Sequence, residues 1–320
     1  MRLTLLSVVL LLAVGAGCGL AEVNLIAYER YIGTGSNREI WTIRPDGSNP
    51  MQLTSGYNDH LPVWSPDGTQ LAISPGGDPY GTSVARVNAD GSNRTTLATG
   101  TSLLGGWGPG SKIMYGKDTW SEPPQLWMMD GDGSNQTKLL DWAFPGCLSP
   151  DGSKFAYTQI AGAYESLYVR DLSGSGYGTP LVSSWVNALN PIWSPDGTKL
   201  AFNGNTGGST GNDIYAINTD GTGLTQLTST SEPDQRPTWA PDGTKIAFMR
   251  EMSPVTGNWD LWVMGADGTG QVNITNTPDI GEAHPSWQPG STPVPEVPTY
   301  ALAALGALAL GLVRLRRRGT

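Results

Sequence analysis

The sequence predicts an all-β fold, a six-bladed β-propeller built from four-stranded antiparallel blades. The first observation is a turn phrase, Trp-Ser-Pro-Asp-Gly-Thr in its fullest form, that recurs along the chain. Six full or degenerate copies begin about 41 to 48 residues apart, at Trp64, Trp107, Leu148, Trp193, Trp239 and Trp287. That interval is the period of four-stranded propeller blades. The second observation is composition, because 43 Gly, 24 Pro and only 15% charged residues suit short strands joined by tight turns.

Each repeat unit contains two turns separated by short strands. In the copy at Trp193, the proline presets φ, the aspartate tolerates the next position, and Gly197 accepts a positive φ. A strand then resumes at Lys199. The next strand begins at Ile214, alternates apolar and polar residues, turns at Asp220 and returns.

Two types of strand can be counted separately, and each occurs six times. Those after the first turn begin near Ile26, Leu71, Ile113, Phe155, Leu200 and Ile246. Those that follow them begin near Ile40, Val84, Leu126, Leu167, Ile214 and Leu261. The turn at Trp287 has no strand after it, and the strand at residues 25–28 has no turn before it. We therefore predict that the N-terminal strand completes the last blade and closes the ring, which protects the sheet edges.

Both turn phrases, in this order, resemble the PD40 repeats of the TolB-like six-bladed β-propeller family over about residues 24–290. The resemblance implies this fold and a periplasmic location in the cell envelope. TolB itself also carries an N-terminal α/β domain and works with the Tol–Pal system. We expect no such domain between Ala21 and Leu25, so the resemblance does not assign TolB's partners to this chain.

Residues 1–21 have the layout of a secretory signal peptide, with Arg2, an apolar run and then small residues. Cleavage after Ala21 fits this layout. Lipoprotein processing, in which Cys18 becomes the lipidated first residue, is the alternative. We therefore expect an exported protein that signal peptidase processes, with residues 22–290 as the propeller.

The C-terminal region has three parts. Residues 291–298 are a Pro-rich linker, and residues 299–320 combine an apolar stretch, predicted as a helix, with a basic cluster that starts at Arg314. The layout resembles PEP-CTERM and IPTL-type sorting tails, which implies removal by an exosortase-type protease. A permanent membrane anchor is the alternative.

The formal net charge is −9, and it is about −14 without the five arginines near the two ends. So acidic a body repels nucleic acid and anionic lipid. We expect no nucleic-acid partner, membrane contact only through the terminal segments, and a monomer. After signal removal Cys147 stands alone, as small core filler without a disulfide.

An acidic residue stands five positions before the tryptophan in three repeats, at Asp59, Asp234 and Glu282. The resemblance places this segment at the start of the innermost strand, so these carboxylates are predicted to crowd one mouth of the central channel. Together with the nearby His60, Arg236 and His284, they would bind a cation or a basic peptide end. The alternative is that each acid caps the turn before its strand.

No catalytic, cofactor or metal site is predicted. The chain has only two histidines, fewer than the three protein ligands of most catalytic zinc sites. Aromatic residues outside the repeated turn would stack on sugars, anchor a partner, or pack between blades. They are Trp120, Trp142, Trp185, Trp259, Tyr57, Tyr80 and Tyr164.

We therefore expect an envelope-associated, non-catalytic binding scaffold for a protein or an extracellular glycan. One alternative is a polysaccharide lyase, which would need clustered basic residues to abstract a proton and neutralise a uronate. The other alternative is a structural matrix protein without a specific ligand.

Overall fold

The computed structural model describes residues 24–31, 37–76, 82–101, 103–119, 122–161, 164–182, 186–205, 211–253 and 257–290. The predicted signal peptide, linker and C-terminal tail lie outside these ranges. Within them, no helix is long and apolar enough to cross a bilayer. The helical structure there is a single 3-10 turn, η1 (Pro109–Ser111).

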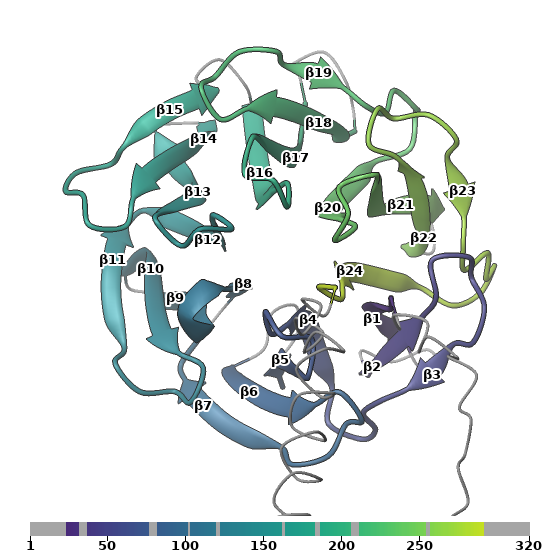
Figure 1. Cartoon of the computed structure of the whole chain (residues 1–320). Coiled ribbons are helices and arrows are strands. Elements are labelled where there is room, and N and C mark those ends of the chain that lie inside the picture. The colour runs from purple at the N-terminus through teal and green to yellow at the C-terminus, as the bar shows by residue number, and fades with distance from the viewer. Residues whose placement is uncertain are drawn as a thin grey trace, which may run out of the picture.

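Six four-stranded antiparallel sheets surround one central axis, which confirms the predicted propeller (Figure 1). From the inside outward, blade 1 contains β24 (Glu282–Trp287), β1 (Ile26–Tyr31), β2 (Arg38–Ile43) and β3 (Met51–Gln52). Blade 2 contains β4 (Asp59–Trp64), β5 (Gln70–Pro75), β6 (Ser83–Asn88) and β7 (Thr95–Thr99). Blade 3 contains β8 (Leu103–Gly108), β9 (Lys112–Thr119), β10 (Glu122–Asp130) and β11 (Thr137–Asp141).

The remaining three blades repeat this arrangement. Blade 4 contains β12 (Ala143–Leu148), β13 (Lys154–Ala161), β14 (Tyr164–Asp171) and β15 (Thr179–Val182). Blade 5 contains β16 (Val186–Trp193), β17 (Lys199–Asn205), β18 (Asp213–Asn218) and β19 (Thr225–Gln226). Blade 6 contains β20 (Asp234–Trp239), β21 (Lys245–Ser253), β22 (Asn258–Gly265) and β23 (Val272–Asn273).

The first and last strands of the propeller close the ring. Strand β1 pairs antiparallel with β24, so that Ile26 lies opposite Trp287, as the offset of the repeats predicts. Just beyond this pair, the Gln288 N–H donates to the Leu25 carbonyl at 2.8 Å. The inner strand of blade 1 therefore comes from the far end of the propeller sequence, and closure pairs β1 on both sides, with β24 and with β2.

The repeated turns have the predicted chemistry. In the first copy, Gly68 has φ of 67°, and its N–H donates to the Ser65 carbonyl at 2.8 Å. Asp67 Oδ1 accepts the Thr69 N–H at 3.1 Å and the Ser65 hydroxyl at 2.6 Å. The aspartate thus satisfies local donors that the turn leaves unpaired, which explains its place in the phrase.

The hydrophobic core consists of six clusters, one at each junction between neighbouring blades. The repeated tryptophan of each blade, or Leu148 in blade 4, packs in the cluster shared with the preceding blade. Two indoles also donate across the junction. Trp64 Nε1 donates to the Ser286 carbonyl at 3.1 Å, and Trp193 Nε1 donates to the Cys147 carbonyl at 3.2 Å. The tryptophan therefore repeats because every blade must bind the one before it.

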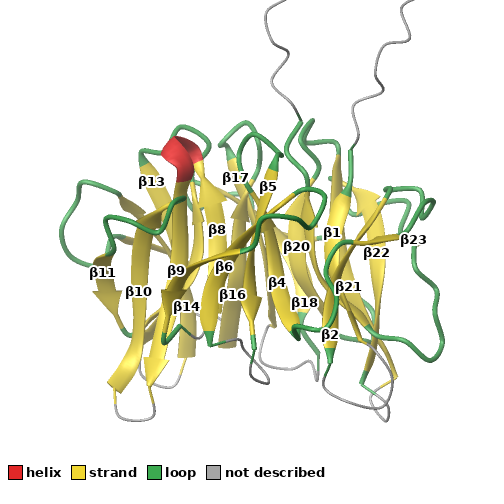
Figure 2. Ribbon diagram, turned by 90° about the horizontal axis from the view of Figure 1, so that it is seen from below, coloured by secondary structure: helices red, strands yellow, loops and turns green. Residues whose placement is uncertain are grey.

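The strands run between two faces of the disc (Figure 2). The turn face carries the Asp-Gly turns and the chain near residues 24 and 290, since Gln288 Nε2 donates to the Gly68 carbonyl at 2.9 Å. The opposite face, which we call the mouth face, carries the starts of the six innermost strands.

Candidate functional site: the central channel and its mouth

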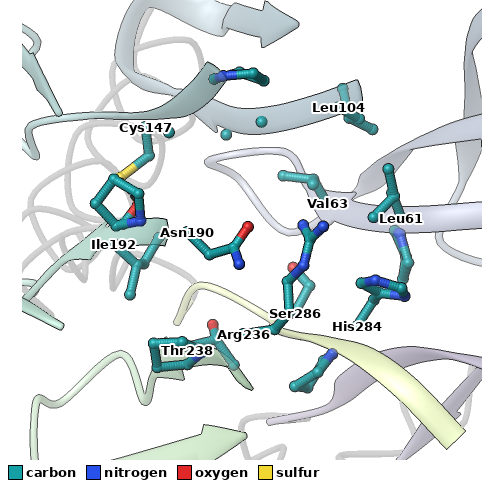
Figure 3. Close-up of a pocket in the computed structure, with 18 residues that line it drawn as sticks. Leu61, Val63, Leu104, Cys147, Asn190, Ile192, Arg236, Thr238, His284 and Ser286 are labelled. Carbon is teal, nitrogen blue, oxygen red and sulfur yellow. Dashed lines mark hydrogen bonds between the residues drawn. The ribbon is translucent and has the colours of Figure 1, made fainter. Parts of the chain in front are cut away.

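The residue three positions before the repeated tryptophan occupies the same place in every blade. These six residues, which we call the channel ring, are His284, Leu61, Leu104, Pro145, Asn190 and Arg236, in order of blades 1 to 6. With the two residues that follow each of them, they line a central cavity of about 120 Å³ (Figure 3).

A β-bulge near this position interrupts the pairing of every innermost strand with its neighbour. Four of the six ring residues have a left-handed backbone there, with φ of 51° at Leu61, 54° at Asn190, 55° at Arg236 and 54° at His284. This conformation is unfavourable for residues with a Cβ, and bulges of this kind re-aim side chains. The regular repeat thus turns one side chain from each blade towards the axis.

The channel ring is amphipathic around its circumference. Its members in blades 2 to 4 are apolar, namely Leu61, Leu104 and Pro145. Its members in blades 5, 6 and 1 are polar, namely Asn190, Arg236 and His284. Figure 3 shows the Arg236 guanidinium reaching into the pocket, with Asn190 on one side and Leu61 and His284 on the other.

A larger cavity of about 350 Å³ forms the mouth of the channel on the mouth face. Besides five ring residues, it is lined by Tyr31, Arg38, Leu103, Phe144, Thr158, Glu165, Leu189 and Gln235. Burial raises the pKa of the Glu165 carboxyl on this rim. Five of the six blades contribute to this wall, so a ligand seated here would contact most of the ring.

A buried carboxylate, Glu29 of β1, organises the wall beside His284. Its Oε1 accepts the Leu61 N–H at 2.6 Å and lies 2.7 Å from His284 Nδ1. Its Oε2 lies 3.7 Å from Arg38 Nη1 and 3.8 Å from His60 Nδ1. The cluster therefore links the closing strand pair β1–β24 to the inner strand of blade 2.

The charge states follow from these contacts. Burial alone raises the pKa of Glu29, but His284, His60 and the Leu61 N–H outweigh it and lower the pKa to about 2. Burial lowers the pKa of His284, and the nearby Arg236 and Arg38 act in the same direction against Glu29. At neutral pH the pair is an ionised carboxylate beside a neutral imidazole.

The predicted acidic residues do not line the channel or its mouth. Asp59 is buried and accepts both terminal nitrogens of Arg94, at 2.6 and 2.9 Å. Arg94 in turn stacks over the ring of Tyr57, 4.3 Å from its centroid. The Asp59 carboxylate is therefore neutralised by Arg94 within blade 2.

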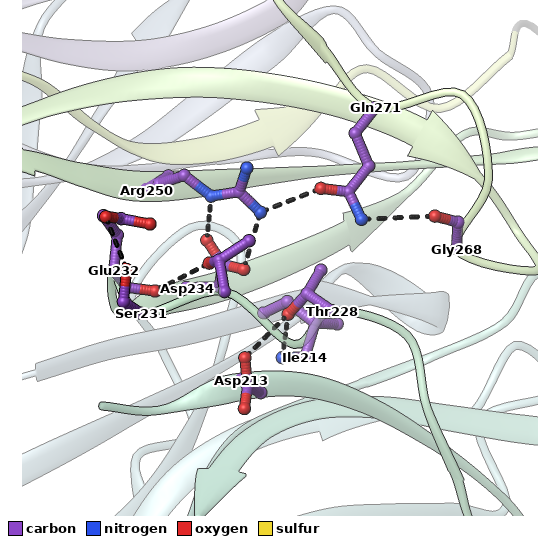
Figure 4. Close-up of polar contacts among 10 residues, drawn as sticks. Asp213, Ile214, Thr228, Ser231, Glu232, Asp234, Arg250, Gly268 and Gln271 are labelled. Carbon is purple, nitrogen blue, oxygen red and sulfur yellow. Dashed lines mark hydrogen bonds and ion pairs between the residues drawn. The ribbon is translucent and has the colours of Figure 1, made fainter. Parts of the chain in front are cut away.

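Asp234 also pairs with an arginine of its own blade, Arg250 on β21 of blade 6 (Figure 4). Arg250 donates to its two oxygens at 2.6 and 2.8 Å, and Arg250 Nη2 also donates to Gln271 Oε1 at 2.8 Å. The neighbouring carboxyl of Asp213 has a raised pKa, because of its burial and because of Asp234. Asp234 is thus part of a buried polar network and not of the channel surface.

Glu282 is the third acid, and it is buried beside Arg30 in a longer ion pair than those of Asp59 and Asp234. The Thr277 hydroxyl donates to it at 2.6 Å, while Arg30 Nε lies 3.6 Å away. Burial raises the pKa of Glu282 to about 7, with a further contribution from Asp260. With the three acids held inside their blades, they supply no converging ligand set for a cation.

Of the six predicted site residues, Arg236 and His284 line both cavities. His60 contacts the Glu29 cluster behind the wall, where its Nδ1 lies 2.7 Å from Arg38 Nη1. Sequence reasoning missed Glu29, Arg38 and the rest of the channel ring. Aligning the repeats three positions before the tryptophan, and not five, would have revealed the ring.

The other candidates occupy varied positions. Cys147 is buried, as predicted, and burial raises its pKa to about 12. Tyr57 and Trp142 are exposed, with 61% and 51% of their surface accessible, whereas Trp259 packs partly buried between blades 6 and 1. Trp120, Trp185, Tyr80 and the side chain of Tyr164 lie outside the described residues. Among the residues that the structure describes, no three His, Cys, Asp or Glu side chains gather as a metal site.

Comparison with known proteins agrees with this architecture. The model of the TolB beta propeller domain matches residues 110–294, more than half of the chain. The chain belongs to the TolB beta-propeller family.

The curated relatives are matched over shorter regions. The chain is 32% identical over 120 residues to the Tol-Pal system protein TolB of Anaeromyxobacter dehalogenans (strain 2CP-C), covering 37% of this chain and 26% of that protein. It is 33% identical over 131 residues to the protein TolB homolog of Chlorobium chlorochromatii (strain CaD3), covering 39% and 28%. The matched region thus spans only about a quarter of each relative's length.

Solved structures show the likeness of the fold. TolB from Acinetobacter baumannii superposes with a TM-score of 0.70 at 18% identity, over 83% of this chain and 67% of that chain. A chain of the nidogen/laminin complex superposes with a TM-score of 0.64 at 9% identity, over 83% and 98%. At such identities the comparison establishes the propeller and nothing about its ligand.

Proposed function

We propose that this protein is an exported, non-catalytic binding scaffold whose ligand sits at the mouth of the channel. The observation that supports this proposal is the convergence of side chains from different blades on one cavity of about 350 Å³. That volume falls in the range of about 300–1,000 Å³ typical of ligand sites. The closed ring supplies the rigid frame on which such a site depends.

The ligand is a protein or an extracellular glycan. Two curated relatives are named for TolB, one of them as a Tol-Pal system protein, which supports a protein partner in the cell envelope. The exposed rings of Tyr57 and Trp142 provide contact area for either class. The six residues Asp59, His60, Asp234, Arg236, Glu282 and His284 divide into two roles in this proposal. Arg236 and His284 contact the ligand, and the other four support the wall from behind.

We also propose how the two ends of the chain are processed during export. Signal peptidase removes residues 1–21, or lipoprotein processing modifies Cys18. The C-terminal tail directs sorting, through cleavage by an exosortase-type protease or as an anchor. Mass spectrometry of the mature protein from an exporting bacterial host distinguishes these routes, because each leaves different terminal residues.

Site-specific photo-crosslinking tests the binding face. A photoreactive amino acid replaces Gln235, which lines the mouth, or Lys199, which is exposed at the turn face. In the exporting host, we expect adducts of defined mass from position 235 and not from position 199. Equal labelling from both positions, or none from position 235, would rule out the mouth as the binding face. Release of unsaturated products from polyuronates would instead establish lyase activity.

A further inference from the structure

We propose that the channel ring recognises the free C-terminal carboxylate of a polypeptide whose last side chain is apolar. The carboxylate lies against Arg236 and Asn190, and the apolar side chain lies against Leu61, Leu104 and Pro145. This inference rests on the proposed function, because it specifies which chemical groups of the ligand bind at the channel mouth.

The placement of the arginines supports an anionic ligand. Arg94 and Arg250 each hold a buried carboxylate of their own blade, and Arg38 lies beside Glu29. The Arg236 guanidinium also has contacts within the chain, and it extends into the pocket (Figure 3). A guanidinium carries five N–H donors in a planar fork, and this geometry suits a carboxylate.

A buried asparagine positions the polar side of the ring. Asn203 Oδ1 accepts Asn190 Nδ2 at 2.8 Å and the Arg236 backbone N–H at 3.3 Å. Asn203 is fully buried, and its Nδ2 has no acceptor among the described residues. Asn203 lines neither cavity, so it positions the Asn190 amide and the Arg236 backbone from behind the channel wall.

The shape and the apolar side favour a peptide end over a sugar acid. Leu61, Leu104 and Pro145 present hydrocarbon to the ring, whereas a uronate carries hydroxyls on every side that would go unpaired there. The central cavity has a volume of about 120 Å³, and the apolar half of the ring lines one side of it. A chain terminus places a carboxylate and a side chain on one carbon, and so it can contact both halves of the ring at once.

Fluorescence anisotropy of the full chain with labelled pentapeptides tests this inference. The peptides end in Leu, Val, Lys or Asp, and each is made with a free or an amidated C-terminus. We expect the free Leu and Val peptides to bind at least tenfold more tightly than their amidated forms and than the Lys and Asp peptides. Equal binding of free and amidated forms, or no binding of any peptide, would overturn the proposal.

Matched variants assign the carboxylate contact. R236N removes the guanidinium while keeping a residue that tolerates the left-handed backbone, and K199Q removes one charge from the turn face. We expect R236N to abolish the preference for a free carboxylate without changing the circular dichroism spectrum, and K199Q to leave that preference intact. A preference that survives in folded R236N would contradict the assignment.

A competition arm separates this inference from the broader function. If oligogalacturonate binds in an Arg236-dependent way and the peptides do not, the mouth is a glycan site and the peptide proposal is wrong. If the peptides fail while position 235 still crosslinks a partner, the scaffold function stands without C-terminal recognition. If position 235 captures nothing, the proposed function itself fails.

Discussion

Two buried carboxylates of blade 1 differ in charge state because their surroundings differ. Glu29 receives a backbone N–H at 2.6 Å and has an imidazole nitrogen 2.7 Å away, and its pKa falls to about 2. Glu282 has one hydroxyl donor and an arginine 3.6 Å away, and burial raises its pKa to about 7. The contacts of Glu29 outweigh its burial and stabilise the carboxylate, whereas those of Glu282 do not outweigh its burial, and the protonated acid is stabilised.

Replacing Glu29 by Gln removes the charge that faces Arg38, His60 and His284. We expect a loss of about 3 kcal/mol in the free energy of unfolding at pH 7, because one partner of a buried charge cluster is lost. The pKa of Glu29 is lower in the folded state, so its contribution is present above about pH 4.5 and is lost as the pH falls towards 2. Urea unfolding of wild type and E29Q should therefore converge at acid pH. A constant difference between them would contradict this explanation.

Replacing Glu282 by Gln should have the opposite sign. The folded state binds the proton more tightly than the unfolded state, so wild-type stability falls as the pH rises from 4.5 through 7. We expect E282Q to gain about 1 kcal/mol at pH 8, since part of the benefit is offset by the lost attraction to Arg30, and to gain nothing at pH 4.5. Urea unfolding at both pH values measures this, with the exposed D279N as control.

At the scale of the elements, the innermost strand with its bulge determines the channel wall. The strands and turns were predictable because Pro-Asp-Gly chemistry and alternating apolar residues act within a few positions of sequence. The bulge at Leu61 was not, because it appears only when β4 pairs with β5. The partners of the buried acids could not be predicted from the sequence either. Asp59 meets Arg94, 35 residues away, and Glu29 meets His284 from the other end of the propeller. Sequence reasoning thus located two residues of the wall but misplaced the carboxylates.

The outer turns make another contact that depends on neighbouring blades. Gly91 has φ of 81°, and a Cβ there would lie 2.0 Å from the Leu53 carbonyl oxygen of blade 1. Gly56 has a similar φ of 74° but nothing within 4 Å of its Cβ position. We expect G91A to lose about 3 kcal/mol of stability and G56A about 1 kcal/mol, since only the first adds a clash to the backbone strain. Thermal unfolding of both variants measures the difference, and equal losses would show that Gly91 is needed only for its φ.

At the scale of the whole molecule, stability depends on the closure of the ring. Each core cluster is shared by two blades, so losing one strand exposes two junctions. Strand β1 contributes Ile26 and Tyr28 to the junction with blade 6, and Ala27 to the junction with blade 2.

A chain that lacks residues 1–31, and therefore β1, should lose cooperative unfolding and associate through the exposed edges of β24 and β2. The matched control lacks only residues 1–23 and keeps β1. Size-exclusion chromatography and thermal unfolding compare the two. A monomeric, cooperatively unfolding chain without β1 would show that the ring does not need this strand.

Because Leu25 and Gln288 are hydrogen-bonded neighbours on the turn face, the polypeptide enters and leaves the propeller at one point of that face. A label, a fusion partner or a solid support attached directly at residue 24 or residue 290 therefore lies on that side. The cavity that contains Arg236 opens on the other side, so an immobilised propeller presents it unobstructed to the solution.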